Sequence, residues 1–239
     1  MLNPPPRTDN EPPARTVRRA GPWIPALAAW LICVAHQASA TYPFDAGEML
    51  GPPGALPPWS EMLERHQAQI ANVEACIDDR DACPRRARAL HVIVEKGVDL
   101  PRDKQIQLVN RYVNRKTHRY DRRKTTHTDA GKVVRISHWK TLWEFMERGG
   151  DCEDYATTKY FLLRRLGFAP EDLRVVVVYD RRYREHHGVV AVRYDAENTW
   201  LLDTDNHIYR RNKPVEYRYV YAVNELGIWD HDVRVPKRR

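Results

Sequence analysis

The sequence predicts an α+β domain in which N-terminal helices pack on an antiparallel sheet. Between residues 59 and 166, several stretches carry apolar side chains at helical spacing. After residue 173 the pattern changes to short β-branched and aromatic runs, which polar turns separate. Helices followed by consecutive strands are typical of α+β domains, and 239 residues suffice for one such domain with a terminal extension.

Residues 1–40 have the features of a secretion signal peptide. A basic stretch, RTVRRAG, precedes the apolar run PWIPALAAWLICVA, and the small residues ASA stand at 38–40. The apolar run is short for a membrane span, although the sequence leaves open whether it is cleaved or kept as an anchor. We therefore expect export to the periplasm.

Residues 41–58 are rich in Pro and Gly, and we expect them to form a tether or an extended arm. The remaining residues, 59–239, are expected to form a single domain. Its first helical stretch starts at Trp59, with Met62, His66, Ile70 and Val73 at helical spacing. Further helices are expected at 87–97 and 102–120, and the basic segment 117–135 has no clear period and suggests loops or a hairpin.

Two more helices are expected before the strands begin. The stretch TLWEFMERGG (141–150) predicts a short helix that ends at its two glycines. A new helix then opens at Cys152, with Asp151 as N-cap and Glu153 and Asp154 in the first turn, where acidic residues are favoured. The strand-like runs that follow are LRVVVVYD (173–180), HGVVAVRY (187–194), TWLLDTD (199–205) and YRYVYAVNE (217–225).

The chain has four cysteines, and Cys33 lies in the signal segment. Cys76 and Cys83 are separated by six residues that a turn can close, so we expect a disulfide in an oxidising compartment, with free thiols as the alternative. There is no CxxC motif and no Cys/His zinc-finger spacing. Cys152 is then the odd cysteine, either buried and passive or reactive.

The charge of the chain does not indicate a nucleic-acid partner. Removal of residues 1–40, which hold four Arg and two acids, lowers the formal net charge from +7 to about +5. The basic stretches RRAR (85–88) and DRRK (121–124) have no aromatic residues interleaved with them. We interpret them as solvated faces.

Cys152 stands among three carboxylates, which would raise its pKa and weaken it as a nucleophile. His187 begins one strand and Asp203 lies near the end of the next, so a helix N-terminus at that edge would bring all three residues together. Nucleophile, base and orienting carboxylate are the parts of an activated thiol. The alternatives are a packing cysteine, a strand histidine and a turn-forming aspartate.

Over about residues 104–230 the chain resembles a known enzyme family. The runs GGDCEDYATTKYFLLRRLG, LRVVVVYDRRYREHHGVVAV and WLLDTDN, with HWKTLWEFMERGG upstream, are similar to the bacterial transglutaminase-like cysteine proteinases, especially their periplasmic LapG-type members. The resemblance implies a papain-like, transglutaminase-like fold with Cys152 as nucleophile, His187 as general base and Asp203 as orienter. The family has Leu-Asp-Asn where this chain reads LLDTDN, which keeps Asp205 as a rival to Asp203; His186 is the lesser rival to His187.

The resemblance also implies that Asp151 and Glu153 bind calcium. A hard dication prefers oxygen ligands and would cancel the charge that suppresses the thiolate; N-capping alone is the alternative. For the oxyanion, the N–H of Cys152 is one donor, and Trp139 is a second by analogy with related folds, with a core position equally open.

The function that the resemblance implies is a periplasmic, calcium-dependent cysteine endopeptidase. Its substrate would be the N-terminal region of a large surface adhesin, cut at a dialanine site to release cells from a biofilm. An inner-membrane LapD-like receptor would sequester the protease when cyclic di-GMP is high. Two other functions remain open, namely acyl transfer to an amine (transglutaminase or amidase chemistry) and a non-catalytic module that captures a peptide.

Overall fold

The α-helices precede most strands of the main sheet, as the sequence predicts, although the short strand β1 (Glu48–Gly51) comes before them. The computed structural model describes residues 42–120, 124–127, 133–136, 138–210 and 217–231, so the expected signal segment lies outside the described residues. The helices are α1 (Pro57–Ala68), α2 (Ile70–Asp78), α3 (Ala89–Gly97), α4 (Arg102–Val113), α5 (Leu142–Arg148) and α6 (Cys152–Arg165). None of the helices in these ranges has the length and apolar character that a bilayer span requires.

A seven-stranded antiparallel sheet follows, in the order β1-β9-β8-β4-β5-β6-β7. Its strands are β1 (Glu48–Gly51), β4 (Leu173–Asp180), β5 (Glu185–Arg193), β6 (Thr199–Leu202), β7 (Ile208–Tyr209), β8 (Tyr217–Val223) and β9 (Ile228–Asp230). A separate hairpin pairs β2 (Lys124–His127) with β3 (Val133–Ile136). The four predicted strands correspond to β4, β5, β6 and β8, which confirms the α+β class.

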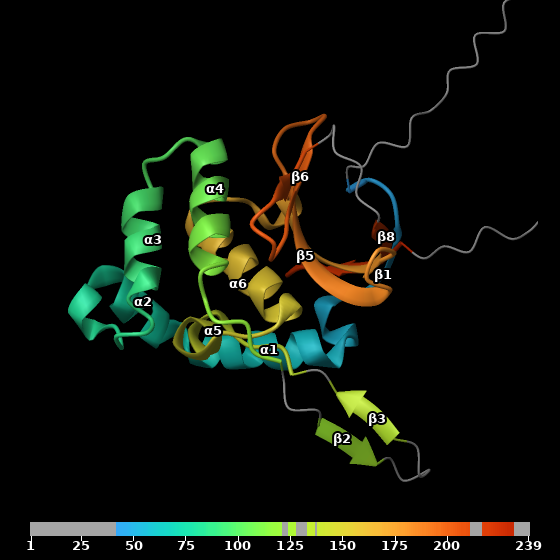
Figure 1. Cartoon of the computed structure of the whole chain (residues 1–239), viewed down its shortest axis with the longest axis horizontal. Coiled ribbons are helices and arrows are strands. Elements are labelled where there is room, and N and C mark those ends of the chain that lie inside the picture. Colours follow the sequence, from blue (N-terminus) through green and yellow to red (C-terminus); the bar gives the residue numbers. More distant parts are fainter. Residues whose placement is uncertain (1–41, 121–123, 128–132, 137, 211–216, 232–239) are drawn as a thin grey trace, which may run out of the picture. The chain divides into compact units, whose positions relative to one another are not determined.

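Helix α6 is the centre of the domain. It packs on β4 and β5 and is flanked by α4 and α5, so that it runs between the helices and the sheet (Figure 1). Every residue from Asp154 to Leu163 is buried. A helix that is buried on all sides has little freedom to tilt or slide, because neighbours contact each of its faces. Its N-terminus, where Cys152 lies, is therefore held at a fixed place beside the sheet.

The segment expected to be a tether is part of the sheet instead. Tyr42 and Phe44 are buried against Val176 and Val178, which point away from the face that α6 covers. The guanidinium of Arg174 lies 5.1 Å from the centre of the Phe44 ring. Residues 48–51 then form β1, which pairs with β9. This segment joins the sheet because the four consecutive valines of β4 make both faces of that strand apolar. Helix α6 covers one face, and the N-terminal aromatic residues cover the other.

Other elements differ from prediction at their ends. The first helical stretch is divided at Gln69 into α1 and α2, and α4 ends at Val113. The expected helix at 102–120 is therefore too long, because residues 117–120 are extended and pair with the turn before α6. Strands β7 and β9 have two and three residues, too few for a detectable period of two.

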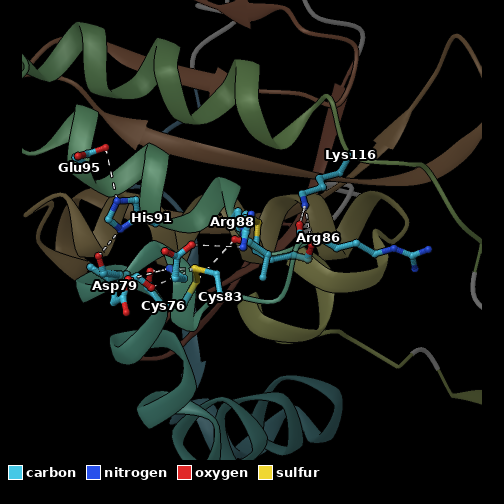
Figure 2. The surroundings of a disulfide bond; sticks show 12 residues. Cys76, Asp79, Cys83, Arg86, Arg88, His91, Glu95 and Lys116 are labelled. Carbon is cyan, nitrogen blue, oxygen red and sulfur yellow. Dashed lines mark hydrogen bonds and ion pairs between the residues drawn. A yellow bond between two sulfur atoms is a disulfide. The ribbon is translucent and has the colours of Figure 1, made fainter.

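The structure joins Cys76 and Cys83 in the expected disulfide (Figure 2). Both cysteines are buried, at the end of α2 and after the short 3-10 helix Arg80–Ala82. Just beyond them, the Lys116 ammonium donates to the carbonyl of Arg86 at 2.5 Å and to that of Met146 at 2.6 Å. The disulfide loop is thus attached to the ends of α4 and α5.

We expect the double variant Cys76→Ser/Cys83→Ser to lower the free energy of unfolding by about 2–3 kcal/mol, because the unfolded chain regains the freedom that this short loop removes. Urea unfolding followed by circular dichroism measures the change. Dithiothreitol should lower the midpoint of the unmodified protein and leave that of the variant unchanged. Equal midpoints for both proteins without reductant would contradict the prediction.

Candidate active site

A tight turn after α5 fixes the point where α6 begins. Gly149 has a φ of 71°, and a Cβ there would lie 2.1 Å from the carbonyl oxygen of Thr117, so both its conformation and its surroundings require glycine. The N–H of Arg119 donates to the carbonyl of Gly150 at 2.8 Å. The segment that follows α4 therefore holds the turn from which Cys152 starts α6.

The three acids around Cys152 have different environments. Asp154 is fully buried, and its carboxylate accepts from the main-chain N–H of Lys140 at 2.6 Å, from the Lys140 ammonium at 2.5 Å and from the N–H of Asp151 at 3.2 Å. A Cβ on Gly150 would meet this carboxylate at 2.1 Å, so glycine is needed there too. Burial raises the pKa of Asp154 to about 6, against the lowering effect of Lys140. Asp154 thus supports the helix start and points away from the sulfur.

The sulfur of Cys152 lies between a carboxylate and a main-chain donor. Its thiol donates to Oε2 of Glu153 at 3.2 Å. Burial raises the pKa of Cys152 well above its ordinary value and the Glu153 charge raises it further, whereas a hydrogen bond from the Gly188 N–H lowers it. Gly188 packs tightly here, since a Cβ on it would lie 3.1 Å from the carbonyl carbon of Cys152. The strand residue after His187 therefore touches the nucleophile's own backbone.

His187 and Asp203 form a close pair. His187 lies on β5 and Asp203 directly follows β6, the neighbouring strand, and Nε2 of His187 is 2.5 Å from Oδ1 of Asp203. Burial lowers the pKa of His187, but the hydrogen bond and charge of Asp203 outweigh it and hold the pKa above its ordinary value. Burial alone would raise the pKa of Asp203, yet His187 and Tyr217 lower it to about 2. The carboxylate is ionised and the imidazole is oriented by it.

The two rival residues also line this part of the structure, but their side chains have other partners. His186 is exposed, and its ring packs edge-on against Tyr179 with centroids 5.5 Å apart. The carboxylate of Asp205 is engaged within its own turn, where it accepts from the N–H of His207 at 2.8 Å and from the hydroxyl of Tyr209 at 2.7 Å. The geometry therefore favours His187 and Asp203 over these neighbours.

Four groups that sequence reasoning missed hold Asp203 in place. The Tyr217 hydroxyl donates to its Oδ2, and the N–H of Thr204 donates to its Oδ1 at 2.5 Å. Its main-chain carbonyl accepts from the ammonium of Lys159 and from the side-chain amide of Asn114, both at 2.7 Å. The only available signal was Lys159, a lysine among the apolar residues of one face of α6.

Lys159 is completely enclosed in the domain. Burial lowers its pKa to about 7, although the charges of Asp203 and Asp205 act in the opposite direction. Burial of an ammonium group costs free energy unless the group is hydrogen-bonded. The position of the Lys159 ammonium is therefore tied to the carbonyl of Asp203. The lysine comes two helical turns after Cys152, and it connects the helix of the nucleophile to the strand end that bears the carboxylate.

Cys152, His187 and Asp203 all line one cavity of about 560 Å³. Asp151 and Glu153 also line it, so two of the acids beside the cysteine face the same space as the sulfur. Trp139 does not: it lies in the core, with its ring edge-on to Trp59 at 5.8 Å between centroids. The structure places Trp139 as a core aromatic because α1 and the segment before α5 pack together around it.

The cavity can perform thiol chemistry. It holds a nucleophilic atom at a helix N-terminus, an imidazole on the adjacent strand and an ionised carboxylate that orients the imidazole. Within the described ranges there is no group of three or more His, Cys, Asp or Glu residues arranged to hold a metal. Asp151 and Glu153 are the carboxylates placed to contribute to one.

Solved structures share this fold. Legionella pneumophila LapG is 24% identical over 66% of this chain and 87% of its own, with a TM-score of 0.54. Its calcium-bound form gives a TM-score of 0.55 at the same identity and coverage. Its EGTA-treated form gives 0.56, also at 24% identity, over 68% of this chain and 87% of its own. At this level of identity the likeness establishes the fold.

Comparison with curated protein sequences gave no match. A family model does match: the one described as bacterial transglutaminase-like cysteine proteinase BTLCP covers residues 62–230, well over half of the chain. This range includes every residue of the cavity discussed above. The chain therefore belongs to the bacterial transglutaminase-like cysteine proteinases.

Proposed function

We propose that the chain is a periplasmic, calcium-dependent cysteine endopeptidase in which Cys152 is the nucleophile, His187 the general base and Asp203 the orienting carboxylate. The observation that carries this proposal is the 2.5 Å contact between His187 and Asp203 in the cavity that Cys152 also lines. Membership of a cysteine proteinase family supplies the reaction class, and the shared cavity supports Cys152, His187 and Asp203 as the residues that perform it.

Acylation begins with proton transfer from the thiol of Cys152 to His187. Asp203 engages Nε2 of the imidazole, so Nδ1 is the nitrogen that accepts this proton. The thiolate then attacks the peptide carbonyl carbon, and the C–N bond breaks as His187 returns the proton to the leaving amine. The product of this half-reaction is a thioester. Water, deprotonated by His187, then hydrolyses the thioester and regenerates the thiol.

The start of α6 supplies help for the oxyanion. Cys152 is the first residue of the helix, so its main-chain N–H is among the amides that have no acceptor within the helix. A carbonyl attacked by the sulfur would bring its oxygen close to this donor, at the positive end of the helix dipole. Trp139 is not carried forward as a second donor, since it lies in the core.

Calcium fits the chemistry of Asp151 and Glu153. Both residues are partly buried and line the active-site cavity, and carboxylate oxygens are the ligands that a hard dication prefers. Two carboxylates are only part of a calcium shell, so main-chain or water oxygens would have to supply the others. A bound cation would offset the negative charge next to the sulfur. LapG of Legionella pneumophila, with the same fold, has been solved in a calcium-bound form.

The biological setting follows from the resemblance to LapG-type proteases. We include in the proposal export through the N-terminal signal, cleavage of the N-terminal region of a large surface adhesin, and sequestration by an inner-membrane LapD-like receptor that senses cyclic di-GMP. The first 40 residues, with their basic stretch, apolar run and ASA site, support the export. The resemblance alone supports the adhesin and the receptor.

We expect Cys152→Ala to reduce cleavage of a co-encoded adhesin fragment by at least about 10³-fold, because the variant lacks the thiol that forms the thioester. His187→Ala should act similarly, and the matched variant His186→Ala should retain most of the activity. Gel electrophoresis of the fragment measures the rate, and circular dichroism verifies the fold.

Two results would contradict endopeptidase activity. Incorporation of a labelled amine into the fragment, without cleavage, would identify an acyl transferase. Full biological activity of Cys152→Ala would identify a binding module that needs no thioester.

We expect Asp203→Asn to lower the pKa of His187. Burial and the charge of Lys159 lower this pKa in the folded protein, whereas the hydrogen bond and charge of Asp203, and to a smaller extent the charge of Asp180, raise it. NMR titration of the histidine ring protons, in Cys152→Ala protein, measures the shift. The control is Asp205→Asn, whose carboxylate accepts hydrogen bonds from His207 and Tyr209 rather than from His187. An unchanged His187 titration in Asp203→Asn would rule out the pairing.

We expect calcium to bind Cys152→Ala protein with an affinity that falls about tenfold or more in Asp151→Asn and Glu153→Gln, since each change removes one anionic oxygen ligand. Isothermal titration calorimetry measures this without any need for activity. Glu185→Gln is the matched control, because Glu185 lines the same cavity further from the helix start. EGTA should abolish cleavage by the unmodified enzyme. Equal affinities for all variants would exclude these two residues as ligands.

A further inference from the structure

A second cavity, of about 270 Å³, is bordered by exposed arginines. They come from three segments that are distant in sequence: the loop after the disulfide, the end of α4 with the residues that follow it, and the end of α5. The arginines are Arg86, Arg115, Arg119 and Arg148. We call this the basic cavity. Only Arg86 belongs to a basic run that the sequence makes visible, the RRAR stretch interpreted as a solvated face.

The backbone beneath the basic cavity is firmly held. Lys116 lines it, and its ammonium reaches the carbonyls of Arg86 and Met146, which joins the three segments (Figure 2). The disulfide between Cys76 and Cys83 constrains the loop that leads to Arg86. In Figure 2 the Arg86 side chain extends away from the disulfide. The arginines are therefore presented from a fixed frame, which limits the ordering that a ligand must impose.

The charge of the basic cavity is not neutralised within the protein. In the described ranges none of its four guanidinium groups forms an ion pair, whereas Arg65, Arg102 and Arg164 each do. Its described lining contains five cationic side chains and one carboxylate, Glu147. Positive charge concentrated around a concavity attracts anionic groups, and guanidinium binds carboxylates through paired hydrogen bonds.

The active-site cavity has the opposite charge. Six carboxylates line it, against the single guanidinium of Arg182. They are Asp151, Glu153, Asp180, Glu185, Asp203 and Asp205. An acidic stretch of polypeptide is therefore repelled by the cavity that holds the thiol and attracted by the basic cavity.

One short segment separates the two cavities. His118 and Tyr120 line the active-site cavity, whereas Thr117 and Arg119 line the basic cavity. This alternation is the one expected of extended backbone, whose successive side chains point to opposite sides. His118 also bridges to Gly150, two residues before Cys152. A polypeptide that crosses this segment would meet both cavities within a few residues.

We propose that the basic cavity is an exosite that binds an acidic segment of the protein substrate, outside the residues that enter the active-site cavity. The inference rests on the proposed endopeptidase function and adds the substrate class: an uncharged or basic cleavage site with an acidic stretch close to it. We take Arg115 and Arg148 as its central cations, because they come from two different segments, the residues just after α4 and the end of α5.

The test measures binding without catalysis. The full chain carrying Cys152→Ala is titrated against a short fluorescein-labelled peptide in which glutamate alternates with alanine, and fluorescence anisotropy reports binding. Arg115→Gln/Arg148→Gln should weaken binding about tenfold, since two charge-assisted contacts are lost. The matched control is Lys104→Gln/Arg111→Gln, which removes two exposed cations of the same α4 helix that border a different hollow. The control should bind within about twofold of the parent protein.

Each other outcome would overturn the exosite. Equal weakening by both double variants would mean that only the diffuse net charge attracts the peptide. Binding of the same strength by a glutamine-alanine peptide would exclude charge recognition. An oligonucleotide or inorganic phosphate that binds where the peptide does not would assign the cavity to phosphate. Because the experiment measures binding by an inactive variant, its outcome tests the exosite independently of the proposed proteolytic activity.

Discussion

The hydrogen bond from the Lys159 ammonium to the main-chain carbonyl of Asp203 joins the two halves of the candidate active site. The nucleophile is on a helix and its partners are on a sheet, so catalytic geometry depends on how these two elements meet. Packing holds α6 between the helices and the sheet, and strand pairing holds β6 beside β5 and β7. The buried lysine and Asn114 from the end of α4 bind the main chain just after β6 directly.

The same buried lysine brings positive charge to the site, and this matters for His187. Asp203 raises the pKa of the imidazole, burial lowers it, and Lys159 lowers it further. A base must hold its proton loosely enough to return it to the leaving amine. The charge of Lys159 opposes part of the raising effect that Asp203 and Asp180 have on this pKa. Lys159 therefore contributes both the position of Asp203 and part of the electrostatic balance of the base.

Local patterns in the sequence were enough to nominate Cys152, His187 and Asp203, and the resemblance to the family implied their roles. Cys152 at a helix start, His187 at a strand start and Asp203 at a strand end follow from capping signals and strand runs, and the structure brings the last two together. What the sequence could not show depends on contacts between distant segments. The role of Trp139 is ambiguous in the sequence, because the neighbouring residues do not distinguish a buried core tryptophan from one that donates a hydrogen bond in the active site. Neither the burial of Tyr42 and Phe44 nor the strand β1 is visible in the Pro- and Gly-rich sequence, because the strands that they contact lie far along the chain.

The structure of the extended segment 117–120 also depends on a contact with a distant part of the chain. The local sequence of this segment is polar and basic with no period, which predicts the end of a helix or a loop. In the folded chain Gly149 has no side chain, which lets this segment approach the turn before α6 closely enough to bond with Gly150. This contact positions the segment that lies between the active-site cavity and the basic cavity. Cationic and anionic side chains that are scattered through the sequence thus line two different cavities. The close approach of segment 117–120 depends on Gly149 and Gly150, which also form the turn where α6 begins.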